Sequence, residues 1–182
     1  MVQAEIILRA TGELGEEYSG GIMAWPVPGY TRLTSEFGMR YHPILYIYKL
    51  HTGIDIGAPE GANFIAASDG VVISAEYNYA YGNMVIIDHG GGITTLYAHG
   101  SQILVTPGQI VKRGTPVLKV GSTGYSTGPH AHFEVRIDGQ PVQPLNFLKS
   151  NKKEDNNKTT NSIVNSNNTI QNWKNMEVSN ET

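Results

Sequence analysis

Short runs of β-branched and apolar residues, separated by glycine-containing turns, recur through the middle of the chain. Examples are residues 70–75, 83–88 and 92–97, and only residues 89–91 separate the second run from the third. Runs of this length between turn residues are typical of strands, and the short glycine-containing connection predicts a hairpin. No window shows a sustained helical period, so the pattern predicts a mainly β fold in which an antiparallel sheet folds on itself.

The two ends of the chain differ in composition from this middle region. Residues 1–24 are acidic and glycine-rich, and residues 2–14 would suit a short helix. We interpret residues 1–24 as an N-terminal extension or linker, which could be the stub of a coiled coil. Residues 150–182 are rich in Asn, Ser, Thr and Lys, so they bury too little apolar surface to offset ordering entropy, and we expect a disordered tail. Residues 25–149 remain as one domain, large enough for a hydrophobic core.

The charge balance and the apolar pattern argue against two classes of partner. The 182 residues carry a formal net charge of -3, so we expect no basic surface for nucleic acid or anionic lipid. No stretch reaches the roughly 18 apolar residues of a membrane span. Residues 1–10 also lack the basic start and long apolar stretch of a secretory signal. We therefore expect no membrane insertion by this chain, and either a longer parent protein or another export route.

Histidines and one aspartate form a pattern that suits a metal ion. The chain has no cysteine, which excludes a disulfide framework, a zinc–thiolate site and a cysteine nucleophile. His51 and Asp55 lie four residues apart, and His130 and His132 are alternate residues of a predicted strand, so they should share a face. Zinc accepts imidazole nitrogen and carboxylate oxygen, and a catalytic zinc keeps one position open. Spacing alone thus predicts a metal site with both His130 and His132 as ligands.

The three other histidines favour different interpretations. His99 ends a predicted hairpin strand before Gly100, where it could reach the same cleft as a general base or an oxyanion stabiliser. His42 precedes Pro43, and a polar contact within its loop is favoured over metal ligation. His89 falls in a predicted turn, which favours a solvated turn residue.

These residues belong to a longer series of motifs from residue 25 to residue 148. That stretch resembles the lysostaphin-type (LytM-like) zinc metallopeptidases, which cut peptidoglycan peptides. The matching segments are residues 35–43 (SEFGMRYHP), 51–56 (HTGIDI), 81–83 (YGN) through 88–90 (DHG), 96–99 (LYAH), and 121–124 (GSTG) through 130–135 (HAHFEV).

The resemblance implies a fold and a set of roles. The fold would be a folded antiparallel sheet, barrel-sandwich-like and of duplicated-hybrid type, with a catalytic groove. His51, Asp55 and His132 match the family's ligands to a single Zn2+ ion, and His99 and His130 match its two catalytic histidines. This assignment replaces the argument from strand spacing, which made His130 a ligand. In addition, the segments that carry Asn83 and Tyr97 match parts of the family's cleft, so both are candidate substrate contacts.

We therefore expect a zinc-dependent endopeptidase that hydrolyses amide bonds in peptidoglycan stems or cross-bridges, at the cell envelope or outside the cell. The alternative is a non-catalytic activator or scaffold of other wall hydrolases, although the His99 and His130 positions are filled.

Residues 105–118 have the glycine-punctuated hairpin pattern of biotinyl- and lipoyl-type carrier domains, but no lysine occupies a comparable turn. Residues 45–50 and Tyr125 look particular to this chain and could alter substrate choice. Which histidine is the general base and which peptide bond is cut stay open.

Overall fold

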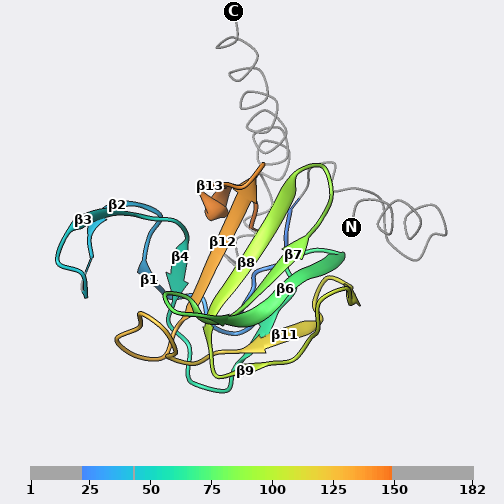
Figure 1. The fold of residues 1–182 in the computed structure, drawn as a ribbon, viewed down its shortest axis with the longest axis horizontal. Helices are drawn as coiled ribbons and strands as arrows, with labels where there is room; N and C mark the ends of the chain where they lie inside the picture. The colour runs from blue at the N-terminus through green and yellow to red at the C-terminus, as the bar shows by residue number, and fades with distance from the viewer. Residues whose placement is uncertain (1–21, 43, 149–182) are drawn as a thin grey trace, which may run out of the picture.

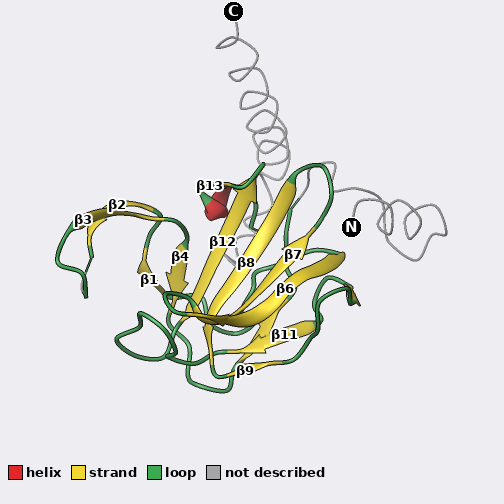
Figure 2. Cartoon of the chain, in the orientation of Figure 1, coloured by secondary structure: helices red, strands yellow, loops and turns green. Residues whose placement is uncertain are grey.

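A computed structural model describes residues 22–42 and 44–148, whose regular secondary structure consists of strands apart from one short 3-10 helix (Figures 1 and 2). The predicted mainly β, antiparallel fold is confirmed, because every pair of strands in this part of the chain is antiparallel. The strands are β1 (Leu33–Ser35), β2 (Gly38–Tyr41), β3 (Tyr48–His51), β4 (Ile54–Ile56), β5 (Asn63–Ile65), β6 (Gly70–Asn78), β7 (Gly82–Asp88), β8 (Ile93–Gly100), β9 (Gln102–Ile103), β10 (Ile110–Val111), β11 (Pro116–Lys119), β12 (Ala131–Ile137) and β13 (Gln140–Val142), followed by the 3-10 helix η1 (Pro144–Asn146).

The largest sheet has eight strands. Its order is β1-β4-β12-β8-β7-β6-β10, and β13 also pairs with β12. The predicted hairpin is present as β7 and β8, in which Ile86 pairs with Leu96. One face of this sheet carries most of the apolar core, including Ile54, Ile56 and Phe133, and the other face carries Asp55 and His132 together with a small buried cluster of Met84, Leu96 and Ala98. The sheet therefore has a core side and a polar side.

A smaller sheet, in the order β5-β11-β9, packs against the core side. Phe64 of β5 lies with its ring centroid 5.0 Å from that of Tyr97 and 6.5 Å from that of Phe133. The rings of Tyr97 and Phe133, on neighbouring strands, are 5.4 Å apart. All three side chains are completely buried. This aromatic cluster fixes the two sheets to each other.

Strands β2 and β3 form a separate two-stranded hairpin, which we call the arm and whose described residues are 38–42 and 44–51. Figure 1 shows the arm curving away from the rest of the described chain. Near its tip, Tyr46 has a left-handed backbone, with φ of 54°, and is 71% exposed. Tyr41 and Tyr48 pair across the ladder with ring centroids 5.5 Å apart. The arm thus extends one wall of the polar side beyond the main sheet.

The ends of the described region meet. Met23 forms a parallel bridge with Leu148, and its amide donates to the carbonyl of Phe147. The expected helix over residues 2–14 and the expected disordered tail from residue 150 both lie outside the described residues. Within residues 22–42 and 44–148, no helix is long and apolar enough to cross a membrane.

Candidate metal centre

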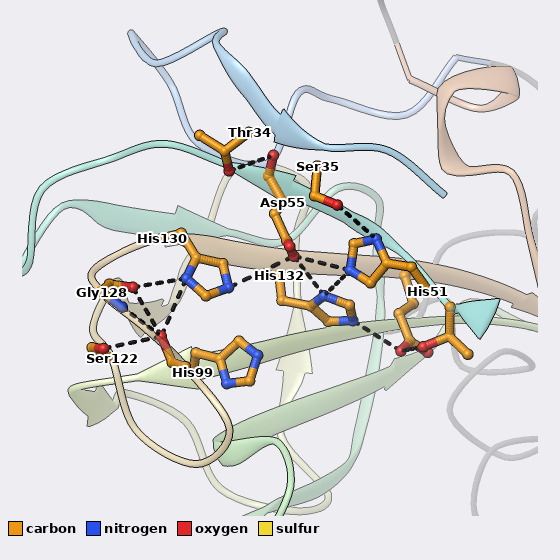
Figure 3. A network of polar contacts seen from close by, with 12 residues as sticks. Thr34, Ser35, His51, Asp55, His99, Ser122, Gly128, His130 and His132 are labelled. Atoms are coloured by element: carbon orange, nitrogen blue, oxygen red, sulfur yellow. Dashed lines mark hydrogen bonds and ion pairs between the residues drawn. The ribbon is translucent and has the colours of Figure 1, made fainter. Parts of the chain in front are cut away.

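Three strands bring His51, Asp55 and His132 together on the polar side of the main sheet (Figure 3). Asp55 of β4 and His132 of β12 are direct partners in the ladder between these strands, so both side chains project from the same point of the sheet. His51 is the last residue of β3, at the base of the arm. All three residues are buried. Residues far apart in the sequence thus form one compact group, which we call the triad.

The donor atoms of the triad converge within hydrogen-bonding distance. His132 Nδ1 lies 2.8 Å from Asp55 Oδ1, and His51 Nε2 lies 3.2 Å from the same oxygen. The two imidazole nitrogens are themselves 3.2 Å apart. Among the described residues this is a group whose three donor atoms could hold one metal ion.

The outer nitrogens of the two rings explain why the inner ones suit a metal. His51 Nδ1 donates to the carbonyl of Glu36 at 2.7 Å, and His132 Nε2 donates to Glu134 Oε1 at 3.0 Å. A neutral imidazole has one N–H, so each inner nitrogen then carries a lone pair. Two lone pairs and a carboxylate oxygen directed at one point repel one another unless a positive charge lies among them, which is a shared proton in the metal-free protein and a metal ion when one is bound. The residues present therefore fit a divalent metal ion.

Burial and the contacts of the triad set its electrostatics. Burial would raise the pKa of Asp55, but hydrogen bonds from His132 and His51 hold that pKa far below its usual range. For His132, burial lowers the pKa, and hydrogen bonds to Asp55 and Glu134 outweigh this and raise it to about 9. The two carboxylates thus attract positive charge to this point, which favours a bound cation.

Glu134 is a site residue that the sequence analysis missed. It is fully buried, and its carboxylate accepts hydrogen bonds from His132, from the hydroxyls of Thr52 and Tyr81, and from Arg136 Nε at 2.7 Å. Burial would raise its pKa, but the hydrogen bond and charge of His132 and the charge of Arg136 lower it to about 2. The signal in the sequence was strand parity, because Glu134 follows His132 by two residues.

The structure places His99 and His130 beside the triad, as expected. His130 Nδ1 donates to the carbonyl of Gly128 at 2.8 Å, and its Nε2 lies 3.6 Å from Asp55 Oδ1. His99 Nδ1 donates to the carbonyl of Thr123 at 2.8 Å. The two rings have centroids 4.8 Å apart, and His99 lies 5.6 Å from the ring of His132. Both rings therefore have an Nε2 free of these anchoring bonds.

A β-bulge turns His99 towards the polar side. Asn83 pairs with Gly100 and Val85 pairs with Tyr97, so two residues of β8 face the single residue Met84 of β7. His99 is one of these two and has φ of 61°. Regular alternation would have placed it on the core side with Tyr97; the bulge re-aims it. Burial, and then the charges of His132 and His130, lower the pKa of His99 to about 4.

The triad forms part of the floor of a cleft. One wall comes from the arm and the other from the segments around residues 80 and 125. The lining residues are Arg40, His42, Lys49, Leu50, His51, Thr52, Asp55, Ala80, Tyr81, His99, Tyr125 and His132. The cleft is open to solvent and its floor is polar, so it can admit an extended polar chain such as a peptide.

The two candidate substrate contacts do not line this cleft. Tyr97 is completely buried on the core side, and its hydroxyl bonds to the amide of Ala67 and the hydroxyl of Thr95, so the expected contact with substrate is corrected. Strand parity is the physical reason, since Tyr97 alternates away from the polar side. Asn83 donates from its side chain to the carbonyl of Gly100 at 3.0 Å, which ties β7 to the end of β8.

The two remaining histidines have structural contacts. His42 Nδ1 accepts from the amides of Ile44 and Leu45, both at 3.2 Å, which is the loop contact expected for it. His89 is only 2% exposed, so the prediction that it is a solvated turn residue is wrong. Its Nδ1 donates to the carbonyl of Asp69 at 2.7 Å, and its Nε2 lies 2.8 Å from the Thr95 hydroxyl.

Comparisons with known proteins show what the sequence and the fold are similar to. The family described as Peptidase family M23 matches residues 49–144. Over 116 residues the chain is 51% identical to the DD-carboxypeptidase/endopeptidase Mpg of Neisseria meningitidis serogroup B, an alignment that covers 64% of this chain and 27% of that relative. The chain therefore spans little more than a quarter of that relative's length.

Two solved structures have a similar fold. A zinc-containing peptidase from Vibrio cholerae is 38% identical, with a TM-score of 0.63, and the alignment covers 68% of this chain and 39% of that one. The catalytic domain of lysostaphin from Staphylococcus simulans is 30% identical, with a TM-score of 0.61, covering 66% of this chain and 93% of that one.

Proposed function

The chain belongs to peptidase family M23, and on that premise we propose that it is a zinc-dependent endopeptidase that hydrolyses amide bonds in the peptide stems or cross-bridges of peptidoglycan. Family membership confirms the resemblance drawn from the sequence. The whole protein's substrate and partners belong to the proposal, because the chain spans 27% of its curated relative. Peptidoglycan as substrate would put the activity at the cell envelope or outside the cell.

The convergence of three lone pairs beside two further imidazoles is the observation that carries this proposal. We assign His51 Nε2, Asp55 Oδ1 and His132 Nδ1 as the atoms that hold one Zn2+ ion. Two imidazoles and one carboxylate are a common protein ligand set of catalytic zinc. When bound, the ion supplies Lewis acidity, which polarises a carbonyl and lowers the pKa of water.

His99 and His130 are the proposed catalytic histidines. In each ring Nδ1 donates to a backbone carbonyl, so a neutral ring presents a lone pair at Nε2. One ring accepts a proton from the attacking water at this atom. The other stabilises the negative oxygen of the tetrahedral intermediate, and for that it must carry a proton at Nε2. The C–N bond then breaks as the amine nitrogen receives the proton that the first ring accepted, and no covalent bond to the enzyme forms.

The residues around these groups orient them. Thr123 and Gly128 fix the two catalytic rings through their carbonyls, and Glu134 fixes His132. Tyr81 lines the cleft, and its hydroxyl donates to Glu134 at 2.9 Å. This hydrogen bond holds the Tyr81 ring in position as one wall of the cleft beside the triad. The substrate would lie between this wall and the arm.

Purified protein and isolated cell walls test the proposal. We expect the zinc-loaded protein to lower the turbidity of a wall suspension and a chelator to stop this, with activity restored by added zinc. A non-catalytic activator or scaffold would leave the walls intact with and without chelator. That result would overturn the proposed activity.

Variants separate the two kinds of role. His51→Ala, Asp55→Ala and His132→Ala should lose both bound metal, measured by elemental analysis, and wall lysis. His99→Ala should retain metal and lose lysis. His42→Ala is the control for metal content, because His42 lines the cleft but its ring nitrogen Nδ1 accepts hydrogen bonds from its own loop and does not contact the triad's donor atoms. Retained metal in His51→Ala would contradict the ligand set.

A further inference from the structure

Two cations of the arm face each other beside the triad. Arg40 of β2 and Lys49 of β3 are direct partners in the ladder of the arm. Both side chains line the cleft that contains Asp55 and His132. Like charges directly opposite each other in a sheet are destabilising. The pair therefore costs the arm stability unless an anion lies between or beside the two groups.

The protein itself supplies little negative charge there. Asp55 is the sole carboxylate among the residues that line the cleft, and its Oδ1 already contacts both histidines of the triad. Arg40 Nη2 lies 3.6 Å from Asp55 Oδ2, beyond the usual length of an N–H···O hydrogen bond. Within residues 22–42 and 44–148, Lys49 makes no ion pair.

The guanidinium of Arg40 also has an N–H donor without a hydrogen-bond partner in the described part of the chain. This donor is the buried Nε, while the side chain as a whole is 31% exposed. An unpaired buried donor is costly, and a planar guanidinium pairs best with a carboxylate, through two parallel bonds. Burial, and then the charges of Arg40 and Lys49, lower the pKa of nearby His42, which reflects the same uncompensated positive charge.

We propose that Arg40 and Lys49 form a carboxylate-binding subsite, and that the preferred substrate is a peptide with a free carboxylate close to its scissile amide. The inference rests on the proposed function and narrows its substrate class. D-alanyl cross-links to diaminopimelate carry such a carboxylate on the carbon that bears the amide nitrogen. A glycine bridge carries none, so the subsite disfavours it.

Matched peptides test the subsite. The substrates are a D-alanyl–diaminopimelate cross-linked peptide with the free carboxylate, the same peptide with that carboxylate amidated, and pentaglycine. With zinc-loaded protein we expect kcat/KM for the free carboxylate to exceed that for the amide roughly ten- to hundredfold, the range of a charge-assisted hydrogen bond. Equal rates on the free acid and the amide, or faster cleavage of pentaglycine, would overturn the subsite and leave the endopeptidase intact.

Variants of the two cations complete the test. Arg40→Gln and Lys49→Gln should each lower the ratio of kcat/KM for the free carboxylate substrate to kcat/KM for the amide, whereas this ratio stays at the wild-type value in a control outside the cleft. Lys49 is exposed, so Lys49→Gln should fold even if Arg40→Gln does not. The matched control is Lys112→Gln, which removes a positive charge paired with Asp69 away from the cleft.

The alternative role for Arg40 is to hold Asp55 in place. In that case Arg40→Gln would slow both peptides equally and lower the metal content, and this result would overturn the subsite. If the wild-type protein binds zinc but cleaves none of the peptides and no walls, the proposed function itself fails. The two failures are thus distinguishable.

Discussion

Four histidines at the metal centre, the two of the triad and the two catalytic rings beside it, are each oriented by the nitrogen that faces away from this centre. His51, His99 and His130 donate from Nδ1 to backbone carbonyls, and His132 donates from Nε2 to Glu134. Each ring therefore has its tautomer fixed by the surrounding fold, with its other nitrogen left for a ligand. The chemistry of the cleft depends on these outer contacts as much as on the rings.

We expect Glu134→Gln to weaken metal binding by about 10–100-fold, because Glu134 fixes the ring of His132 and makes it a better donor. The change keeps the size of the side chain but removes the charge that offsets Arg136. Titration with zinc in competition with a chromogenic chelator measures the affinity. Glu76→Gln is the control, because Glu76 lies on β6 with an exposed hydrogen bond to Ser74. Equal affinities in the two variants would contradict the role.

We expect buried His89 to make stability depend on pH. Burial lowers its pKa below the ordinary 6.5, so below about pH 6.5 the unfolded chain binds a proton that the folded chain resists. Stability is then unaffected above this pH and falls as the pH drops, by at most about 1.4 kcal/mol per pH unit. Urea unfolding at pH 7.5 and pH 5.5 should show a larger loss for wild type than for His89→Gln.

At the residue scale the sequence indicated which residues meet but not all of their surroundings. The identities of His51, Asp55 and His132 followed from a motif whose members the fold does bring together. Tyr97 was misjudged because a motif gives neighbours in sequence and not the side of the sheet. His89 was misjudged because its burial depends on Asp69 and Thr95, which only the fold brings to it.

At the scale of the element, ladder register and one bulge build the site. Asp55 and His132 meet because β4 and β12 pair in that register, and a shift by one residue would send one of them into the core. His99 reaches the cleft because of the bulge in β8. The hairpin β7–β8 was predictable from its apolar runs and short turn. The bulge was not, since a left-handed residue leaves no periodic signal in the sequence.

We expect Gly53→Ala to weaken metal binding although it removes no donor. A Cβ at this position would clash with the backbone carbonyl oxygen of Phe133, so the connection between β3 and β4 would have to move away from β12. Such overpacking costs about 1–3 kcal/mol and separates His51 from Asp55. Thermal unfolding and zinc titration measure the two effects. Gly128→Ala is the control, because its Cβ would meet open space, and its unfolding should change little.

At the scale of the molecule, the aromatic cluster of Phe64, Tyr97 and Phe133 joins the two sheets. The main sheet was foreseeable from its long apolar runs. The small sheet was not, because β5, β9 and β11 are only 3, 2 and 4 residues long and pair across distant parts of the sequence. The motifs lie on the main sheet and the arm, so the site was easier to predict than the packing beneath it.

We expect Phe64→Ala to destabilise the protein by about 3–5 kcal/mol, because it leaves a cavity between the two sheets. The exposed Tyr77→Ala should change the free energy of unfolding by no more than about 0.5 kcal/mol. Urea unfolding followed by tryptophan fluorescence measures both. A small effect for Phe64→Ala would mean that the main sheet is stable without the smaller one.

The arm divides the triad between two parts of the molecule that need not open together. His51 ends a two-stranded sheet, whereas Asp55 and His132 are partners in the eight-stranded sheet. A lone hairpin is marginally stable in water, and such units open with free energies well below that of global unfolding. Opening of the arm would withdraw one donor and both cations and leave two donors in place. The rate at which a bound ion is released would then follow the rate of amide hydrogen exchange in β3. Both rates would be much faster than global unfolding.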